Sequence, residues 1–352
     1  MPDRETLRYA YLRWVVAPVI GAMGLDASLR LARRLAREVR RLRSAAWRKA
    51  CSRCHAAVQR SAADSLNDCR ARLRSAPAII DEMYDHVARF WIEAAFIHRR
   101  LRHSSWRSFV HVDRAEELLA LRQSGGCLLA TACYGNPAVA AVALGELFRP
   151  VHVVIDPPRQ PLLRKWQEAW CRHEWVRAVE RPETAWKVPE ILRNGGVVLM
   201  FCDQERAAGP AVPARFLGRT FQAYPTFGRL AGWLQVPIGV VMCRRDPTRP
   251  FNFTLTPHGV VHADRTAWTQ SPDKECGRLV RQVLTLVERV VMADPAQYFW
   301  LLPNGRNSVG GTSGHLAGES ALSEQASVRP SGRGLPQRPI PALLGDPTAA
   351  HP

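Results

Sequence analysis

Residues 127–147 read CLLATACYGNPAVAAVALGEL, and this stretch decides the fold. The apolar run 127–132 predicts a buried strand, the Gly-Asn-Pro that follows predicts a tight turn, and the Ala/Val-rich remainder predicts a helix. A buried strand that passes through a turn into a helix is typical of a parallel α/β sheet, which usually binds its ligands at that turn. The turn offers only Cys133, Tyr134 and Asn136, and no His, Ser or carboxylate.

The 352-residue chain is strongly basic, with a net charge of +18. Residues 1–110 hold 22 basic and 10 acidic residues, which accounts for +12 of that total. A basic end on a folded body indicates an anionic partner, either nucleic acid or a membrane surface; solvated helix faces in an Arg-rich protein are the structural alternative. The sequence contains no nucleic-acid recognition motif and no interleaved aromatic and basic residues, so we expect an anionic membrane surface and no nucleic acid as partner.

Nine cysteines at irregular spacing argue against a disulfide framework and favour a reducing compartment. The segment Cys51-Ser52-Arg53-Cys54-His55 matches the attachment pattern of c-type haem. That chemistry requires export, and no signal peptide is visible. We therefore favour two ordinary helix cysteines over haem, zinc or redox use, and we expect no metal and no cofactor.

The N-terminus predicts a helix that lies on a membrane surface. The uncharged run 14–25 is short of the roughly 20 residues that a membrane-spanning helix needs. Apolar side chains flanked by arginines suit the headgroup region, so we expect residues 1–27 to form an interfacial membrane-anchoring helix. The apolar residues concerned are Trp14, Val15, Val16, Val19, Ile20 and Met23, and the flanking arginines are Arg4, Arg8 and Arg13.

Further along the chain, the apolar pattern divides the sequence into a helical region, 28–108, an α/β body, 109–306, and a disordered tail, 307–352, that is poor in large apolar residues. Amphipathic helices are expected over 28–60 and 78–101. The fold class is therefore α/β, with a mostly parallel sheet flanked by helices and preceded by an amphipathic helical N-terminal region. The expected strands are 109–112, 127–132, 151–155, 196–201, 238–243 and 253–256. The expected helices of the body are 115–123, 137–148, 161–173, 185–194, 226–234 and 274–292.

Four segments in order carry a family resemblance. They are the strand and turn through Tyr134-Gly135-Asn136, the strand 151–155 with its loop, the block from Asp203-Gln204 to Arg215-Phe216, and the segment 295–300. The first resembles a strand leading into a His-x-Gly-Asn-Trp-Glu turn, and the third resembles an Asp-Gln and Phe-Phe-Gly block. Together they resemble the lipid A biosynthesis (lauroyl/myristoyl) acyltransferases of the lysophospholipid acyltransferase superfamily.

This resemblance implies transfer of a fatty acyl group from an acyl thioester to a hydroxyl of a (glyco)lipid acceptor. The donor would be acyl carrier protein or acyl-CoA, and the reaction would take place at the cytoplasmic face of the bacterial inner membrane. In the family a His, paired with a carboxylate five positions on, deprotonates the acceptor hydroxyl. The resemblance assigns substrate binding to Tyr134, Gly135, Asn136, Asp203, Gln204, Arg215 and Phe216.

The catalytic positions depart from the family pattern. Cys133 stands in the His position, Ala138 in the carboxylate position, and Asp156 where a loop Arg is expected. Two hypotheses stay open. Cys133 could be a nucleophile, because a thiolate at a helix N-terminus can attack a thioester. Alternatively, the chain is a catalytically inactive homologue that acts as a lipid- or partner-binding subunit.

Overall fold

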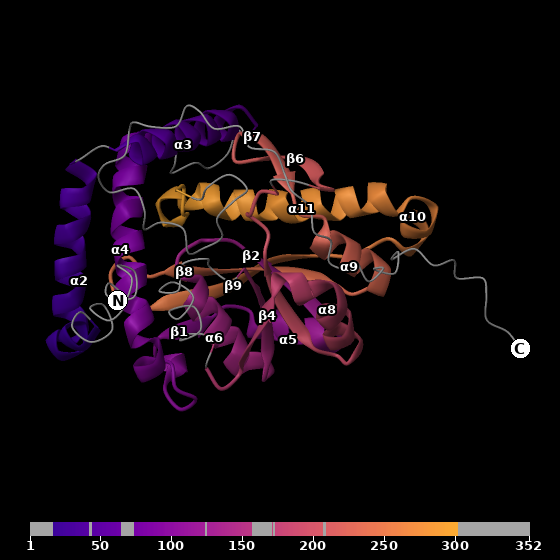
Figure 1. The fold of residues 1–352 in the computed structure, drawn as a ribbon, viewed down its shortest axis with the longest axis horizontal. Coiled ribbons are helices and arrows are strands. Elements are labelled where there is room, and N and C mark those ends of the chain that lie inside the picture. The colour runs from indigo at the N-terminus through magenta and orange to yellow at the C-terminus, as the bar shows by residue number, and fades with distance from the viewer. Residues whose placement is uncertain are drawn as a thin grey trace, which may run out of the picture. The chain divides into compact units, whose positions relative to one another are not determined.

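A computed structural model of the chain describes residues 17–41, 44–64, 74–123, 125–156, 171, 173–206 and 209–301. The chain divides at Gly314, and all of these residues belong to the first unit, Met1–Gly314. Its N-terminal part is helical: α2 (Ala17–Arg41) and α4 (Ala76–Arg100) lie side by side at the left of Figure 1, and α3 (Ala45–Asp64) runs along the top. The helix expected over 28–60 is thus two helices, because α2 ends at Arg41 and α3 begins at Ala45.

A seven-stranded sheet forms the centre of the α/β body, in the order β1-β9-β8-β2-β5-β3-β4. Neighbouring strands are parallel except for β8 and β9, which pair antiparallel. The predicted α/β class with a mostly parallel sheet is therefore confirmed. The strands are β1 (Val110–Val112), β2 (Cys127–Thr131), β3 (Val151–Ile155), β4 (Val176–Glu180), β5 (Val197–Phe201), β8 (Ile238–Arg245) and β9 (Phe253–Val261).

Both faces of the sheet are covered, which explains the continuous apolar run of β2. Leu128 and Ala130 pack into a core with α8 (Thr184–Arg193), α9 (Thr226–Leu234) and α11 (Pro272–Ala293). Cys127 and Leu129 pack on the other side with α5 (Ala115–Gln123) and α6 (Pro137–Phe148). A short helix, α10 (Arg265–Gln270), precedes α11.

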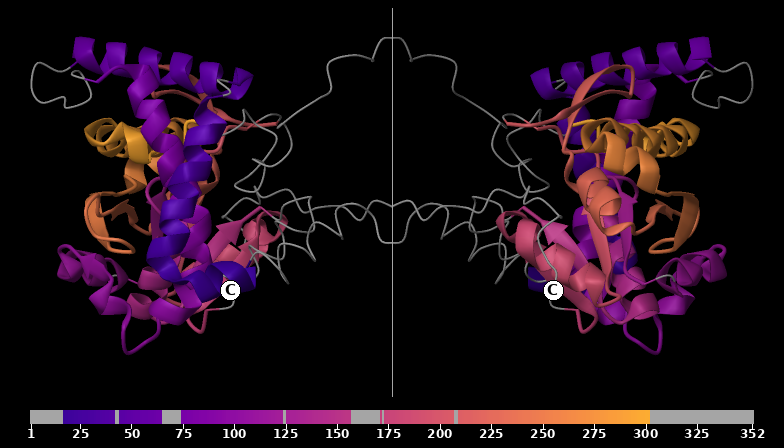
Figure 2. Two further views of the ribbon diagram at one scale, coloured as in Figure 1. Left: turned by 90° about the vertical axis from the view of Figure 1, so that its left-hand side faces the viewer. Right: turned by 90° about the vertical axis from the view of Figure 1, so that its right-hand side faces the viewer.

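In the left view of Figure 2, α2 stands in front of the rest of the unit and is the outermost element on that side. It bends at Gly24, where the backbone has φ 74°. Within the described residues, no helix combines the length and the apolar character that crossing a bilayer requires.

Sequence reasoning missed three strands. β4 contributes only Val176 and Val179 to the core, so it lacks an alternating pattern. β6 (Val212–Phe216) and β7 (Arg219–Ala223) form a separate antiparallel hairpin. Most of the helix expected over 161–173, residues 1–18 of the membrane-anchoring helix expected over 1–27, and the tail 307–352 lie outside the residues whose side chains are described.

Candidate functional site

The turn between β2 and α6 is fixed by contacts with two distant segments. Gly135 has φ 57°, and a Cβ there would lie 2.0 Å from the carbonyl oxygen of Cys243. Its amide donates to the carbonyl of Gln297 at 2.9 Å, and Tyr134 forms an isolated antiparallel bridge with Tyr298. Only glycine fits this position, because both the backbone conformation and the close approach exclude a side chain.

Asn136 begins α6 as its N-cap. Its Oδ1 accepts from the amides of Ala138 and Val139 at 3.1 and 3.2 Å, which satisfies two amides that the helix leaves without partners. Its Nδ2 donates to Glu93 Oε2 at 2.8 Å, and the residue is fully buried. Asn136 therefore holds the turn in place, and both ends of its side-chain amide are already bonded.

Cys133 is buried at the end of this strand. Its amide donates to Asp203 Oδ2 at 2.8 Å, and its carbonyl accepts from the amide of Phe299 at 3.0 Å. Burial raises the pKa of the Cys133 thiol well above its ordinary value of 9.0, and the Asp203 carboxylate raises it further. The side chain in the family's His position is thus a neutral thiol beside a carboxylate.

Asp203 lies next to Cys133 because it follows β5, the neighbour of β2, where Thr131 pairs with Phe201. Burial raises the pKa of Asp203 to about 6, while the Cys133 amide and the Tyr298 hydroxyl act in the opposite direction. Phe216 packs against Tyr298 with ring centroids 6.5 Å apart. Asp203 and Phe216 are therefore at the same corner as the turn, as the sequence suggested.

Ala138, in the family's carboxylate position, is buried in the first turn of α6. The carboxylate that reaches this region is Glu93 of α4, through Asn136. Both Glu93 oxygens also accept from the Arg245 guanidinium, each at 2.7 Å, in a pair that is about 1 % exposed on either side. Both Glu93 oxygens are therefore occupied by hydrogen bonds from Arg245 and Asn136. Glu93 does not take the place of the carboxylate that the family has at position 138.

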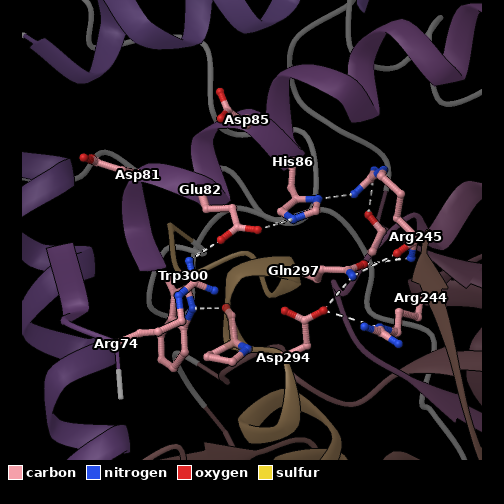
Figure 3. Close-up of polar contacts among 12 residues, drawn as sticks. Arg74, Asp81, Glu82, Asp85, His86, Arg244, Arg245, Asp294, Gln297 and Trp300 are labelled. Carbon is pink, nitrogen blue, oxygen red and sulfur yellow. Dashed lines mark hydrogen bonds and ion pairs between the residues drawn. The ribbon is translucent and has the colours of Figure 1, made fainter. Parts of the chain in front are cut away.

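Arg245 links this buried network to His86, and through His86 to Glu82 and Arg74, as Figure 3 shows. It donates to the Gly135 carbonyl at 3.1 Å and to His86 Nδ1 at 2.8 Å. Because a guanidinium can only donate, Nδ1 is the acceptor and His86 Nε2 carries the proton. Nε2 lies 3.8 Å from Glu82 Oε1, and hydrogen bonding to His86, helped by Arg74, lowers the pKa of Glu82 to about 2.

His86 is a poor base despite its position. Burial lowers its pKa, and the nearby Arg245 charge lowers it further, against the opposing effect of Glu82. Both ring nitrogens face a partner, so neither offers a free lone pair to a substrate. Sequence reasoning missed Glu93 and His86; the available signal was two polar residues within the apolar stripe of the predicted helix over 78–101.

An apolar pocket of about 50 Å³ opens between α4 and the turn. Its wall on α4 is Met83, His86, Val87, Phe90 and Trp91, and its opposite wall is Cys133, Gly135, Pro137, Gln297, Tyr298 and Phe299. A cavity of about 150 Å³ can hold a benzene-sized molecule, so the smaller space here fits the end of a hydrocarbon chain. The lining chemistry suits an apolar ligand.

The remaining predicted site residues lie elsewhere. Gln204 accepts a hydrogen bond from Arg181, and Arg181 Nε also donates to Asp156 Oδ1 at 2.5 Å. The negative charge of Asp156 is therefore neutralised by Arg181. Arg215 is exposed on the β6–β7 hairpin, so the fold does not bring it to the turn either.

The Cys51 and Cys54 pair lies on α3. Cys54 is fully buried, and burial raises its pKa to about 12. Among the described residues, no group of three His, Cys, Asp or Glu side chains is arranged to hold a metal ion. This geometry is that of helix cysteines packed into a core.

Comparison with known proteins agrees with the family resemblance of the sequence. A sequence model of the bacterial lipid A biosynthesis acyltransferases matches residues 2–306. A search of curated proteins finds no match. The family match spans the helical region and the whole α/β body, so the chain belongs to the bacterial lipid A biosynthesis acyltransferase family.

Proposed function

We propose that this protein is a catalytically inactive member of its family that binds a fatty acyl chain at the β2–α6 corner. The observation that carries the proposal is the state of Cys133. A thiolate is the nucleophilic form of cysteine, and here burial and the Asp203 carboxylate both raise the thiol pKa. The family's His and carboxylate positions hold Cys133 and Ala138, and the nearby Glu93 and His86 are both engaged by Arg245.

The acyl-binding part of the proposal is supported by the pocket in front of Cys133. Val87, Phe90 and Trp91 present apolar side chains to it from α4, and Phe299 does so from the opposite wall. Burying hydrocarbon contributes about 25 cal/mol per Å², so a chain end seated there gains affinity without any chemistry. The acyl donor would be acyl carrier protein or acyl-CoA, and the acceptor would be a lipid. The inactive protein would bind them without transferring the acyl group from one to the other.

Filling the pocket tests this binding. Val87→Trp should weaken the binding of a fluorescent fatty acyl ligand at least tenfold, because the added ring occupies the space of the chain. Val260→Trp, the same substitution at a 41 % exposed position outside the pocket, should leave the affinity unchanged. Equal affinity in both variants would reject the pocket as the acyl site.

The same proposal puts the protein on the cytoplasmic face of the bacterial inner membrane. The exposed ridge of α2 supports it: Val19, Met23, Leu31 and Leu35 are 38–58 % exposed, half of the exposed large apolar side chains among the described residues. Exposed Arg30 and Arg34 flank Leu31 and Leu35. Apolar side chains edged by arginines suit an anionic membrane surface.

Co-sedimentation with anionic vesicles tests this assignment. Deleting residues 1–27, or replacing both Leu31 and Leu35 with Ser, should each reduce the pelleted fraction severalfold. Leu119→Ser on α5, where the side chain is 42 % exposed, is the matched control and should pellet like the wild type. Undiminished pelleting of the deletion variant would contradict the anchor, and undiminished pelleting of the double variant would contradict the role of α2.

A further inference from the structure

A second cavity, of about 290 Å³, opens at the edge of the sheet opposite to the acyl pocket. It lies where β3 and β5 begin side by side, at Val151 and Val197, whereas the acyl pocket lies beyond the end of β2. Arg122, His152 and Asn194 supply its polar side chains. Small-molecule sites in proteins are commonly about 300 Å³ or larger, so this cavity can hold a compact ligand.

His152, the second residue of β3, lines this cavity with an unused nitrogen. Its Nδ1 is buried and has no hydrogen-bond partner within the described part of the chain. A hydrogen bond to the backbone of Val197 favours the protonated ring, so this backbone group accepts the bond and the ring proton is on Nε2. Nδ1 is therefore a buried acceptor. Because a buried acceptor without a donor is unfavourable, a ligand that donates to Nδ1 gains affinity.

Arg122, in the last turn of α5, supplies a positive charge to the same cavity. Its Nη1 donates to the Phe148 carbonyl at 2.7 Å, which holds the guanidinium in place. A guanidinium has five N–H donors, so this bond does not exhaust it. Arg177, the partner of His152 in the β3–β4 register, adds a second positive charge beside the histidine. Among the described residues that line the cavity, none is acidic.

The end of α8 does little to oppose this positive charge. The last carbonyls of a helix carry partial negative charge, which repels an anion. Here the amide of Gly195 donates to the Leu192 carbonyl at 3.1 Å, and the amide of Gly196 donates to the Ile191 carbonyl at 2.8 Å. Gly195 has φ 74°, the left-handed conformation that closes a helix in this way. Both carbonyls are therefore already bonded.

We infer that this cavity binds a small oxyanion that also carries a hydroxyl group, of which monohydrogen phosphate is the simplest. Arg122 binds the charged oxygens, and Nδ1 of His152 accepts from the hydroxyl. Sulfate has the same shape but no hydroxyl at neutral pH, so it leaves Nδ1 without a donor. Free phosphate and a hydroxylated phospholipid headgroup share this chemistry. The site is independent of acyl binding, since it lies at the other edge of the sheet.

The test follows the His152 Cε1 signal of the full-length, ¹³C-histidine-labelled protein in NMR titrations, with His152→Gln for assignment. At pH 7.5, inorganic phosphate should bind at least tenfold more tightly than sulfate. Arg122→Gln should weaken phosphate binding at least tenfold, while Arg249→Gln, the same change in an exposed loop, should weaken it less than twofold.

A second probe distinguishes the two sources of the oxyanion. Dihexanoylphosphatidylglycerol, used below its micelle concentration, presents a phosphate and headgroup hydroxyls. Tighter binding of this lipid than of inorganic phosphate would assign the cavity to a lipid headgroup, and the reverse order would assign it to free phosphate.

The pH dependence gives a further readout. Burial lowers the pKa of His152, and the charge of Arg177 lowers it further, so the ring is neutral at pH 7.5. The charged groups around it are Arg177 on β4 and Arg122 on α5, and the lining residues from α8 and β5 are uncharged. A protonated Nδ1 donates to any oxyanion. The affinity for sulfate should therefore rise severalfold from pH 7.5 to pH 5.5, and the preference for phosphate should shrink.

Three results would overturn the inference. They are no shift of the His152 signal with either probe, an equal loss of affinity in Arg122→Gln and Arg249→Gln, and sulfate that binds as tightly as phosphate at pH 7.5. The comparison of phosphate with sulfate uses the wild type alone, so it remains decisive if a variant fails to fold.

Discussion

The amide of Cys133 donates a 2.8 Å hydrogen bond to the Asp203 carboxylate, and the Cys133 thiol is buried beside the same carboxylate. Two adjacent parallel strands, β2 and β5, end here and bring the two residues together. A thiolate formed at this buried point would face the negative charge of Asp203. The geometry therefore stabilises the neutral thiol.

Cys133 should resist alkylation in the folded protein. With iodoacetamide at pH 7.5, we expect its modification to be at least a hundredfold slower than that of a free cysteine, because a buried thiol with a raised pKa offers little thiolate. Cys51, which is only partly buried, is the internal control and should react faster. Peptide mapping by mass spectrometry measures both rates, and equal rates would contradict this description of Cys133.

Asp203 should make stability depend on pH. Its pKa is 3.8 ordinarily and about 6 in the folded state, so the folded state binds the proton more tightly. The stability contributed by protonated Asp203 is fully present below pH 3.8 and is lost as pH rises through about 6, a change of about 3 kcal/mol. Asp203→Asn keeps an acceptor for the Cys133 amide without the charge.

Urea unfolding of Asp203→Asn and wild type across pH 4–8 measures this effect. The variant should gain stability relative to the wild type as pH rises, by about 1–3 kcal/mol at pH 8. A difference that stays constant over this range would show that Asp203 does not titrate there.

The pair of Glu93 and Arg245 should be far more sensitive than a surface pair. Glu93→Gln leaves a buried guanidinium without its counter-ion and should lower the free energy of unfolding by about 3–5 kcal/mol. The double variant Glu93→Leu with Arg245→Met should recover part of that loss. Asp273→Asn, which breaks an exposed pair with Arg229, should change stability by about 0–1 kcal/mol. If urea unfolding shows similar losses of unfolding free energy for Glu93→Gln and Asp273→Asn, the buried pair is no more important for stability than the exposed one.

Gly135→Ala should be severely destabilising. The new Cβ would lie 2.0 Å from the Cys243 carbonyl oxygen, and the backbone has φ 57°. Gly24→Ala is the matched control, since Gly24 has φ 74° with no atom within 4 Å of the added Cβ. The control measures the cost of a positive φ without a steric clash, about 1–3 kcal/mol. The melting temperatures of the two variants should differ by many degrees. Similar melting temperatures would mean that the backbone of the turn can shift to accommodate the added Cβ.

The fold could be predicted where the local pattern of apolar residues reflects how deeply a segment is buried. The apolar run of β2 indicated a strand buried on both faces, and Asn136 with Pro137 marked the start of α6 at the observed residue. β4 escaped detection because only Val176 and Val179 of its five residues are buried. The β6–β7 hairpin was not predicted, because it forms a separate two-stranded sheet. The sequence analysis looked for strands that alternate with helices, and this hairpin has no helix between its strands.

The candidate site could be predicted only in part, because it combines distant segments. The order of motifs indicated that Cys133 and Asp203 belong to one corner. No local pattern joins His86 and Glu93 on α4 to Arg245 at the end of β8, since their contacts span 152 residues or more. A polar residue within an apolar helical stripe signals a buried partner but does not identify it.

The most direct test of inactivity is to look for acyl transfer and for an acyl–enzyme. The purified protein is incubated with a labelled acyl thioester and a lipid hydroxyl acceptor, with Cys133→Ala as the control, and products and intact protein are analysed by mass spectrometry. We predict reversible ligand binding, no transfer product and no adduct at Cys133 in either protein. An acyl adduct on Cys133 that disappears in Cys133→Ala, or any transfer to the acceptor, would contradict the proposal and identify the protein as an active acyltransferase.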